Sequence, residues 1–96
     1  MSKRIRKGNV LENNIVPQEG QEIWGLDQVS KNDRLVSVPV KGAIWYIYNG
    51  DIPDYARVEI LIGPSRKISL PFSRLYDHKP RYEAVHDQYG EVKVWR

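Results

Sequence analysis

Residues 43–48 read AIWYIY, a run of β-branched and aromatic side chains that is typical of a β-strand. An extended backbone places alternate side chains on opposite sides. The two resulting sets are Ile44, Tyr46 and Tyr48 on one side, and Ala43, Trp45 and Ile47 on the other. Only one set can face a single core in an open antiparallel sheet. The other set must be covered by residues 8–30, by another subunit, by a second layer or by a ligand.

Further short strands are predicted on both sides of this run, because apolar alternation and turn residues recur along the chain. Residues 34–40 alternate, and Pro39 predicts that they form an edge strand or a strand with a bulge. The other candidates are residues 22–26, 56–62, 67–72 and a terminal hairpin of 81–85 with 91–95. We therefore predict an all-β fold, a small antiparallel barrel or sandwich (SH3-like or OB-like) with five to six short strands. One short helical turn is expected near residues 73–77.

Length and composition limit the class of protein. The chain has 96 residues, 41% of them hydrophobic, which favours one globular domain. No apolar run approaches the roughly 20 residues of a membrane span, and no apolar segment follows the basic start, as a secretory signal requires. The absence of cysteine excludes disulfides and thiol chemistry. We expect a cytoplasmic protein, or a virion-associated one if a bacteriophage encodes it.

The charge is unevenly distributed along the chain. The first seven residues carry +4, residues 8–33 carry −4 and residues 34–96 carry +3. Residues 1–20 also lack a core-forming pattern, so we predict a basic, flexible N-terminal arm at 1–20 and a single β-barrel domain at 21–96. The basic residues of the arm are Lys3, Arg4, Arg6 and Lys7.

Catalytic patterns are sparse. Pro53–Asp54 followed by Glu91–Lys93 has the order found in many metal-dependent nucleases, in which two carboxylates hold a divalent cation. The same residues are ordinary in a turn and on a solvent-facing strand. His78 and His86 each have an aspartate neighbour, but adjacent side chains of an extended chain face opposite sides, so neither is expected to form an orienting pair.

Two short stretches resemble toxin families. Residues 20–27 (GQEIWGLD) resemble the first strand of MazF-like barrels, and residues 81–96 resemble the terminal hairpin of RelE-like proteins. The N-terminal helices of RelE-like proteins have no counterpart in this sequence. These resemblances imply a toxin-like ribonuclease as an alternative and assign no catalytic residue.

Our principal prediction is a non-enzymatic binding module without a metal, a small-molecule cofactor or a membrane partner. Trp45, Tyr48 and Trp95 are its candidate contacts, since aromatic residues are enriched at binding surfaces. A protein partner is slightly favoured, and a second copy of the chain is a further candidate. Small binding modules of this kind include accessory proteins, inhibitors and connectors that bacteriophages or mobile elements encode.

The alternative is nucleic-acid binding, with phosphates held by basic residues and bases stacked on Trp and Tyr. The candidate phosphate contacts are Lys3, Arg4, Arg6, Lys7, Arg66 and Lys67.

Overall fold

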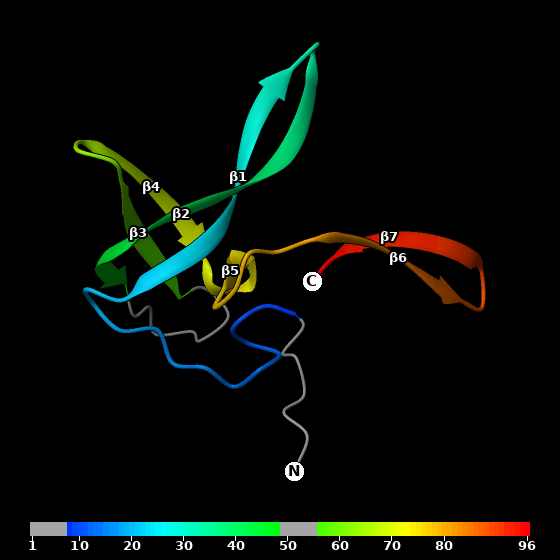
Figure 1. The fold of residues 1–96 in the computed structure, drawn as a ribbon, viewed down its shortest axis with the longest axis horizontal. Helices are drawn as coiled ribbons and strands as arrows, with labels where there is room; N and C mark the ends of the chain where they lie inside the picture. The colour runs from blue at the N-terminus through cyan, green and yellow to red at the C-terminus, as the bar shows by residue number, and fades with distance from the viewer. Residues whose placement is uncertain (1–7, 49–55) are drawn as a thin grey trace.

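The computed structural model describes residues 8–48 and 56–96, and its regular structure is almost entirely antiparallel β-sheet. Five strands form one sheet in the order β4-β3-β2-β1-β5, and β6 and β7 form a separate two-stranded sheet (Figure 1). The strands are β1 (Glu22–Lys31), β2 (Arg34–Tyr48), β3 (Arg57–Ile62), β4 (Arg66–Pro71), β5 (Leu75–Tyr76), β6 (Tyr82–Asp87) and β7 (Gly90–Trp95). The predicted all-β antiparallel class is confirmed.

The predicted helical turn is a short 3-10 turn, η2 (Phe72–Arg74), which lies between β4 and β5. The described strands number seven rather than five to six. The additional strand is β5, whose two residues pair with Trp24 and Gly25 of β1. A strand this short contains no period that a sequence pattern could reveal.

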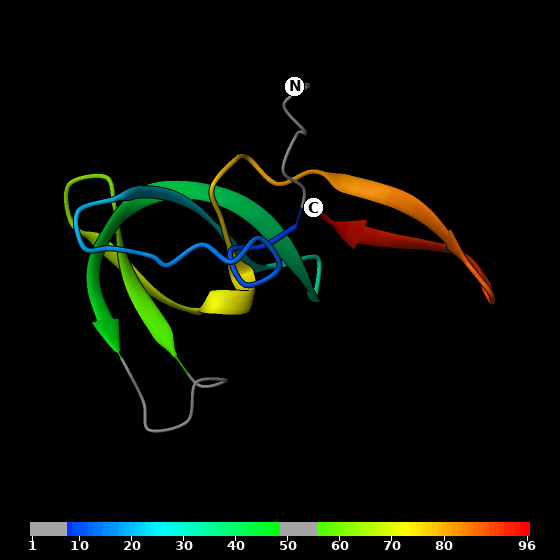
Figure 2. The ribbon, with the colours of Figure 1, turned by 90° about the horizontal axis from the view of Figure 1, so that it is seen from below.

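The two strands expected at 34–40 and 43–48 are one continuous strand, β2, which curves strongly (Figure 2). Its first part pairs only with β1, where Pro39 lies opposite Leu26, and β3 joins it from Ala43 onward. Pro39 therefore lies in a part of β2 with one neighbour, where a missing N–H is tolerated. Gly42 lies at the point where β3 approaches, since a Cβ there would be 2.4 Å from Ile60 Cγ2.

The sheet curls so that β1 and β4 meet across the core, although they are not neighbours in the sheet. A Cβ at Gly25 of β1 would lie 2.4 Å from Leu70 Cδ1 of β4. Asp27 of β1 also forms an ion pair with Arg66 of β4. Among the described strands no ladder joins β4 to β1 or β5, so closure of the sheet into a barrel stays a prediction.

The core lies on the concave side of this sheet. It consists of buried aliphatic residues from the strands together with one from the N-terminal segment: Val10, Ile23, Ile44, Val58, Ile60, Leu70 and Leu75. Val10 has no exposed surface, and its N–H donates to the Leu75 carbonyl at 2.8 Å. The core therefore includes a residue that we assigned to the arm, and residues 1–7 lie outside the described part of the chain.

Two hairpins project from the body of the molecule (Figure 1). The β1–β2 hairpin turns at Asn32 and Asp33, which both have positive φ, 52° and 62°. This is the backbone of the tight two-residue turn that suits twisted strands. The predicted terminal hairpin is present as β6 and β7, with Tyr82 opposite Trp95.

Candidate functional site

A β-bulge in β2 determines which side chains face outward. Ile44 pairs with Ile60 and Tyr46 pairs with Glu59, so Trp45 is an additional residue between two consecutive pairs. A bulge of this kind sets two residues of one strand against one residue of its partner and resets the alternation. Ile44 and Ile60 face the core, and Tyr46 shares the outer side with Glu59. The strict alternation that we predicted for 43–48 is therefore wrong.

The bulge gathers the aromatic side chains of β2 on the outer side of the sheet. Trp45, Tyr46 and Tyr48 are 55%, 50% and 46% exposed, whereas Ile44 is buried and Ile47 packs against the core. We call Trp45, Tyr46 and Tyr48 the aromatic outer face. The predicted contact residues Trp45 and Tyr48 are thus brought together, and Tyr46, which we had placed with Ile44, joins them.

Neighbouring side chains fix the orientation of these rings. The Tyr46 and Tyr48 rings meet edge to face, with centroids 4.7 Å apart and an interplanar angle of 65°. The Lys67 ammonium lies over the Trp45 ring, 4.4 Å from its centroid. Parts of the ring faces are therefore already in contact with other groups of the same chain.

The Tyr48 hydroxyl donates a hydrogen bond to Glu59 Oε2 at 2.9 Å. This bond raises the pKa of Tyr48 above its ordinary value of 10.0, because ionisation of the phenol would place a second negative charge beside the carboxylate. Tyr48 consequently remains a neutral donor near pH 7, and its hydroxyl is held beside the aromatic outer face.

The third predicted contact residue, Trp95, lies elsewhere. It pairs with Tyr82 in the terminal hairpin, with ring centroids 5.0 Å apart. Both rings line a pocket of about 360 Å³ together with Leu35, Val36 and Ser37 near the start of β2. Trp45 is about nine residues further along the strand, which corresponds to about 30 Å of extended chain. Trp95 therefore belongs to a second apolar surface.

Two of the predicted basic residues, Arg66 and Lys67, lie in the described part of the chain. Lys3, Arg4, Arg6 and Lys7 lie outside the described residues. Arg66 forms an ion pair with Asp27, whereas the neighbouring Lys67 reaches Trp45. Arg66 and Lys67 therefore have different partners.

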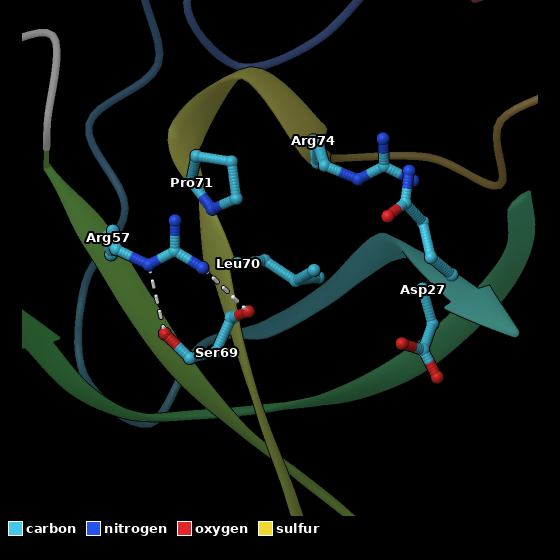
Figure 3. Close-up of a pocket in the computed structure, with 7 residues that line it drawn as sticks. Asp27, Arg57, Ser69, Leu70, Pro71 and Arg74 are labelled. Carbon is cyan, nitrogen blue, oxygen red and sulfur yellow. Dashed lines mark hydrogen bonds between the residues drawn. The ribbon is translucent and has the colours of Figure 1, made fainter.

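The sequence analysis missed a polar pocket beside β4. The pocket has a volume of about 380 Å³ and is lined by residues of β1, β3, β4 and η2. Its polar lining includes the guanidinium groups of Arg57 and Arg74 (Figure 3). We call it the arginine pocket. These arginines are 17 residues apart in sequence, and only the return of the chain through η2 brings them to one cavity.

One histidine forms a pair that we did not expect. His78 Nδ1 lies 2.7 Å from Asp77 Oδ1, so the prediction that neighbouring Asp and His side chains diverge is wrong at this position. The reason is that residues 77–78 form a bend rather than extended chain. The ring's other nitrogen, Nε2, is buried and has no hydrogen-bond partner among the described residues, so it does not open onto a site.

Only part of the residue set proposed for a nuclease lies in the described part of the chain. Glu91 and Lys93 lie on the exposed strand β7, and Asp54 is outside the described residues. Within residues 8–48 and 56–96 no three His, Asp or Glu side chains are grouped so that they could hold a metal ion. Among these same residues, no helix has the length and apolar character needed to cross a membrane.

Comparisons with known proteins give one relative and no family. An uncharacterized protein of Methanocaldococcus jannaschii, MJ1397, is 24% identical over an alignment of 90 residues, and the match covers 90% of this chain. The chain spans only 18% of the length of that relative. No family model matches the sequence, and no solved structure matches it. The chain is therefore similar to one part of a longer archaeal protein.

Proposed function

We propose that this chain is a non-enzymatic docking module that binds a protein partner through the aromatic outer face. The observation that carries the proposal is the bulge at Trp45, which turns three neighbouring aromatic side chains outward, each about half exposed. A strand that keeps its aliphatic residues inside and exposes its aromatic residues resembles the centre of a binding surface, where Trp and Tyr contribute most of the affinity.

A protein partner agrees better with the ring geometry than a nucleic acid does. Single-stranded nucleic acids bind by stacking bases on open aromatic faces. Here Lys67 lies over the Trp45 ring, and Tyr46 and Tyr48 contact each other edge to face. The Glu59 carboxylate beside Tyr48 would also repel a phosphate backbone. Partly covered rings, with a Tyr48 hydroxyl whose proton is held by Glu59 and whose oxygen can still accept a hydrogen bond, favour close packing against apolar and polar protein groups.

The relative supports a modular role. Because a similar segment occupies a small part of MJ1397, a domain of this kind is joined to much longer chain in at least one protein. The proposal takes this modular arrangement as support and assigns no activity of the longer protein to this chain.

An affinity experiment with variants tests the proposal. The tagged full chain is used to capture partners from lysate of the source organism, with and without nuclease treatment. It is compared with a Trp45→Ala/Tyr48→Ala double variant and with Tyr89→Ala as a matched control. Tyr89 is 86% exposed in the turn of the terminal hairpin, away from the aromatic outer face.

We expect the same protein to be retained by the wild type and by Tyr89→Ala. The double variant should lose it, because removing one central aromatic contact typically weakens binding by about 30-fold. Capture that disappears after nuclease treatment would favour a nucleic-acid partner instead. Equal capture by the double variant would overturn the proposal.

A further inference from the structure

We propose that the arginine pocket binds a carboxylate side chain of the protein partner, beside the aromatic outer face. This inference rests on the proposed function in that it takes the partner to be a protein. It adds the chemistry of that partner, which is a segment carrying an acidic residue next to an apolar one. The pocket volume of about 380 Å³ is near the lower end for ligand sites, which suits a side chain rather than a large cofactor.

Both arginines are held rigidly. Arg57 donates from Nε to Ser69 Oγ and from Nη2 to the Ser69 carbonyl, each at 3.1 Å. Arg74 donates from Nε to the Leu26 carbonyl at 2.8 Å and from Nη2 to Ser37 Oγ at 3.0 Å. The anchoring atoms come from β1, β2 and β4, so the two guanidinium groups have little freedom to lose when a ligand binds.

Donors remain after these bonds are made. A guanidinium has five N–H groups in a planar fork, and the bonds above involve only Nε and Nη2 of each arginine. Among the described residues, no hydrogen bond involves Nη1 of either arginine, and these amino groups are the donors that we assign to a ligand in the pocket. Arginine is the side chain best suited to carboxylates, since its fork matches their two oxygens.

The charge of the pocket suits an anion. Arg57 and Arg74 line it together with one carboxylate, that of Asp27 (Figure 3). Arg66 pairs this carboxylate, so the two lining guanidinium groups keep an excess of positive charge that favours an incoming carboxylate.

The pocket continues from the aromatic outer face. Tyr48 lies opposite Arg57 in the β2–β3 ladder, and Arg57 lies opposite Pro71 of the pocket in the β3–β4 ladder. One extended segment can therefore place an apolar side chain on the rings and an acidic side chain between the arginines. We therefore expect the partner segment to carry an acidic residue next to an apolar one.

The arginines also have a structural role, because Arg57 of β3 binds the Ser69 carbonyl of β4 and Arg74 of η2 binds the Leu26 carbonyl of β1. A purely structural role predicts no response to an added carboxylate. The probe is N-acetyl-L-glutamate N-methylamide, added to the full chain while the Nε–H signals of Arg57 and Arg74 are followed by NMR. The glutamine analogue is the neutral control, and dimethyl phosphate represents a nucleic-acid backbone.

We expect saturable shifts of both arginine signals with glutamate at a dissociation constant of about 1–10 mM, and no saturable shift with glutamine. Arg57→Gln should weaken binding at least fivefold and Arg57→Lys, which keeps the charge but loses the fork, about threefold. Lys93→Gln removes one positive charge from exposed strand β7 and should change the dissociation constant for glutamate less than twofold.

Equal shifts with glutamine, no saturation, unchanged affinity in Arg57→Gln or tighter binding of dimethyl phosphate would each overturn the inference. The probe has no apolar side chain that requires the aromatic outer face. Binding of glutamate without partner capture would therefore refute the proposed function alone. Partner capture without binding of glutamate would refute this inference alone.

Discussion

Replacing Trp45 with alanine tests whether the bulge places this ring on the surface. Trp45 is 55% exposed, so just under half of its surface is covered in the folded chain. Complete burial of a large aromatic side chain removes about 150–250 Å² from water, so the covered part is about 70–110 Å². At about 25 cal/mol per Å², and allowing for partial burial in the unfolded chain, this is worth about 1–2 kcal/mol.

The contact with Lys67 adds about 0.5–1 kcal/mol, as expected for an exposed cation–π pair. We therefore expect Trp45→Ala to lower the free energy of unfolding by about 2 kcal/mol. The variant should remain folded, and urea denaturation followed by circular dichroism measures the change. Truncating a core aromatic residue typically costs about 3–5 kcal/mol. A loss above about 3 kcal/mol, or an unfolded variant, would refute the assignment of Trp45 to the outer side.

Three further measurements test other parts of the structure. The bond to Glu59 raises the pKa of Tyr48 in the folded chain, so Tyr48 should ionise above pH 10. The stabilisation that this bond provides should be present at lower pH and be lost as the pH rises through the raised pKa. An NMR titration should show Glu59→Gln lowering the pKa of Tyr48, and an unchanged pKa would contradict the bond. Gly42→Ala should lower the free energy of unfolding, measured by urea denaturation, by about 1–3 kcal/mol, because the new Cβ would be 2.5 Å from the Leu61 carbonyl oxygen. An unchanged midpoint would show that β2 and β3 are further apart at this position. Val10→Ala should cost about 2 kcal/mol because Val10 is fully buried, whereas a loosely attached segment would give no change.

The sequence predicted the parts of this fold that depend on local pattern. Alternating apolar residues indicated the strands around residues 56–62 and 67–72, and the turn residues at 87–90 indicated the terminal hairpin. The fold class follows from such signals because each strand needs only its own period and its own turns. The same signals separated 34–40 from 43–48, since Gly42 normally interrupts a strand but here allows two strands to approach closely.

The site depends on features that local pattern does not contain. The bulge at Trp45 is a property of the pairing between β2 and β3, because only the alignment with β3 shows that β2 has one additional residue. Without it, alternation assigned Tyr46 to the side of Ile44. The aromatic residues were therefore recognised as candidates, but their common face was not.

The arginine pocket depends on tertiary structure to a greater extent. Arg57 and Arg74 lie on different elements, and each binds a carbonyl or hydroxyl that only the curled sheet brings within reach. The location of Trp95, the third predicted contact residue, also depends on tertiary structure. The terminal hairpin places it against Tyr82 and Leu35.

Hydroxyl-radical footprinting of the chain, alone and bound to the protein captured from nuclease-treated lysate, tests the central claim most directly. Oxidation of aromatic side chains reports their exposure, and Tyr89 provides an internal reference because it is 86% exposed in the turn of the terminal hairpin. We predict that the bound partner slows oxidation of Trp45 and Tyr48 at least fivefold relative to Tyr89. Unchanged oxidation of Trp45 and Tyr48, with protection confined to the terminal hairpin, would contradict the assignment of the aromatic outer face as the docking surface.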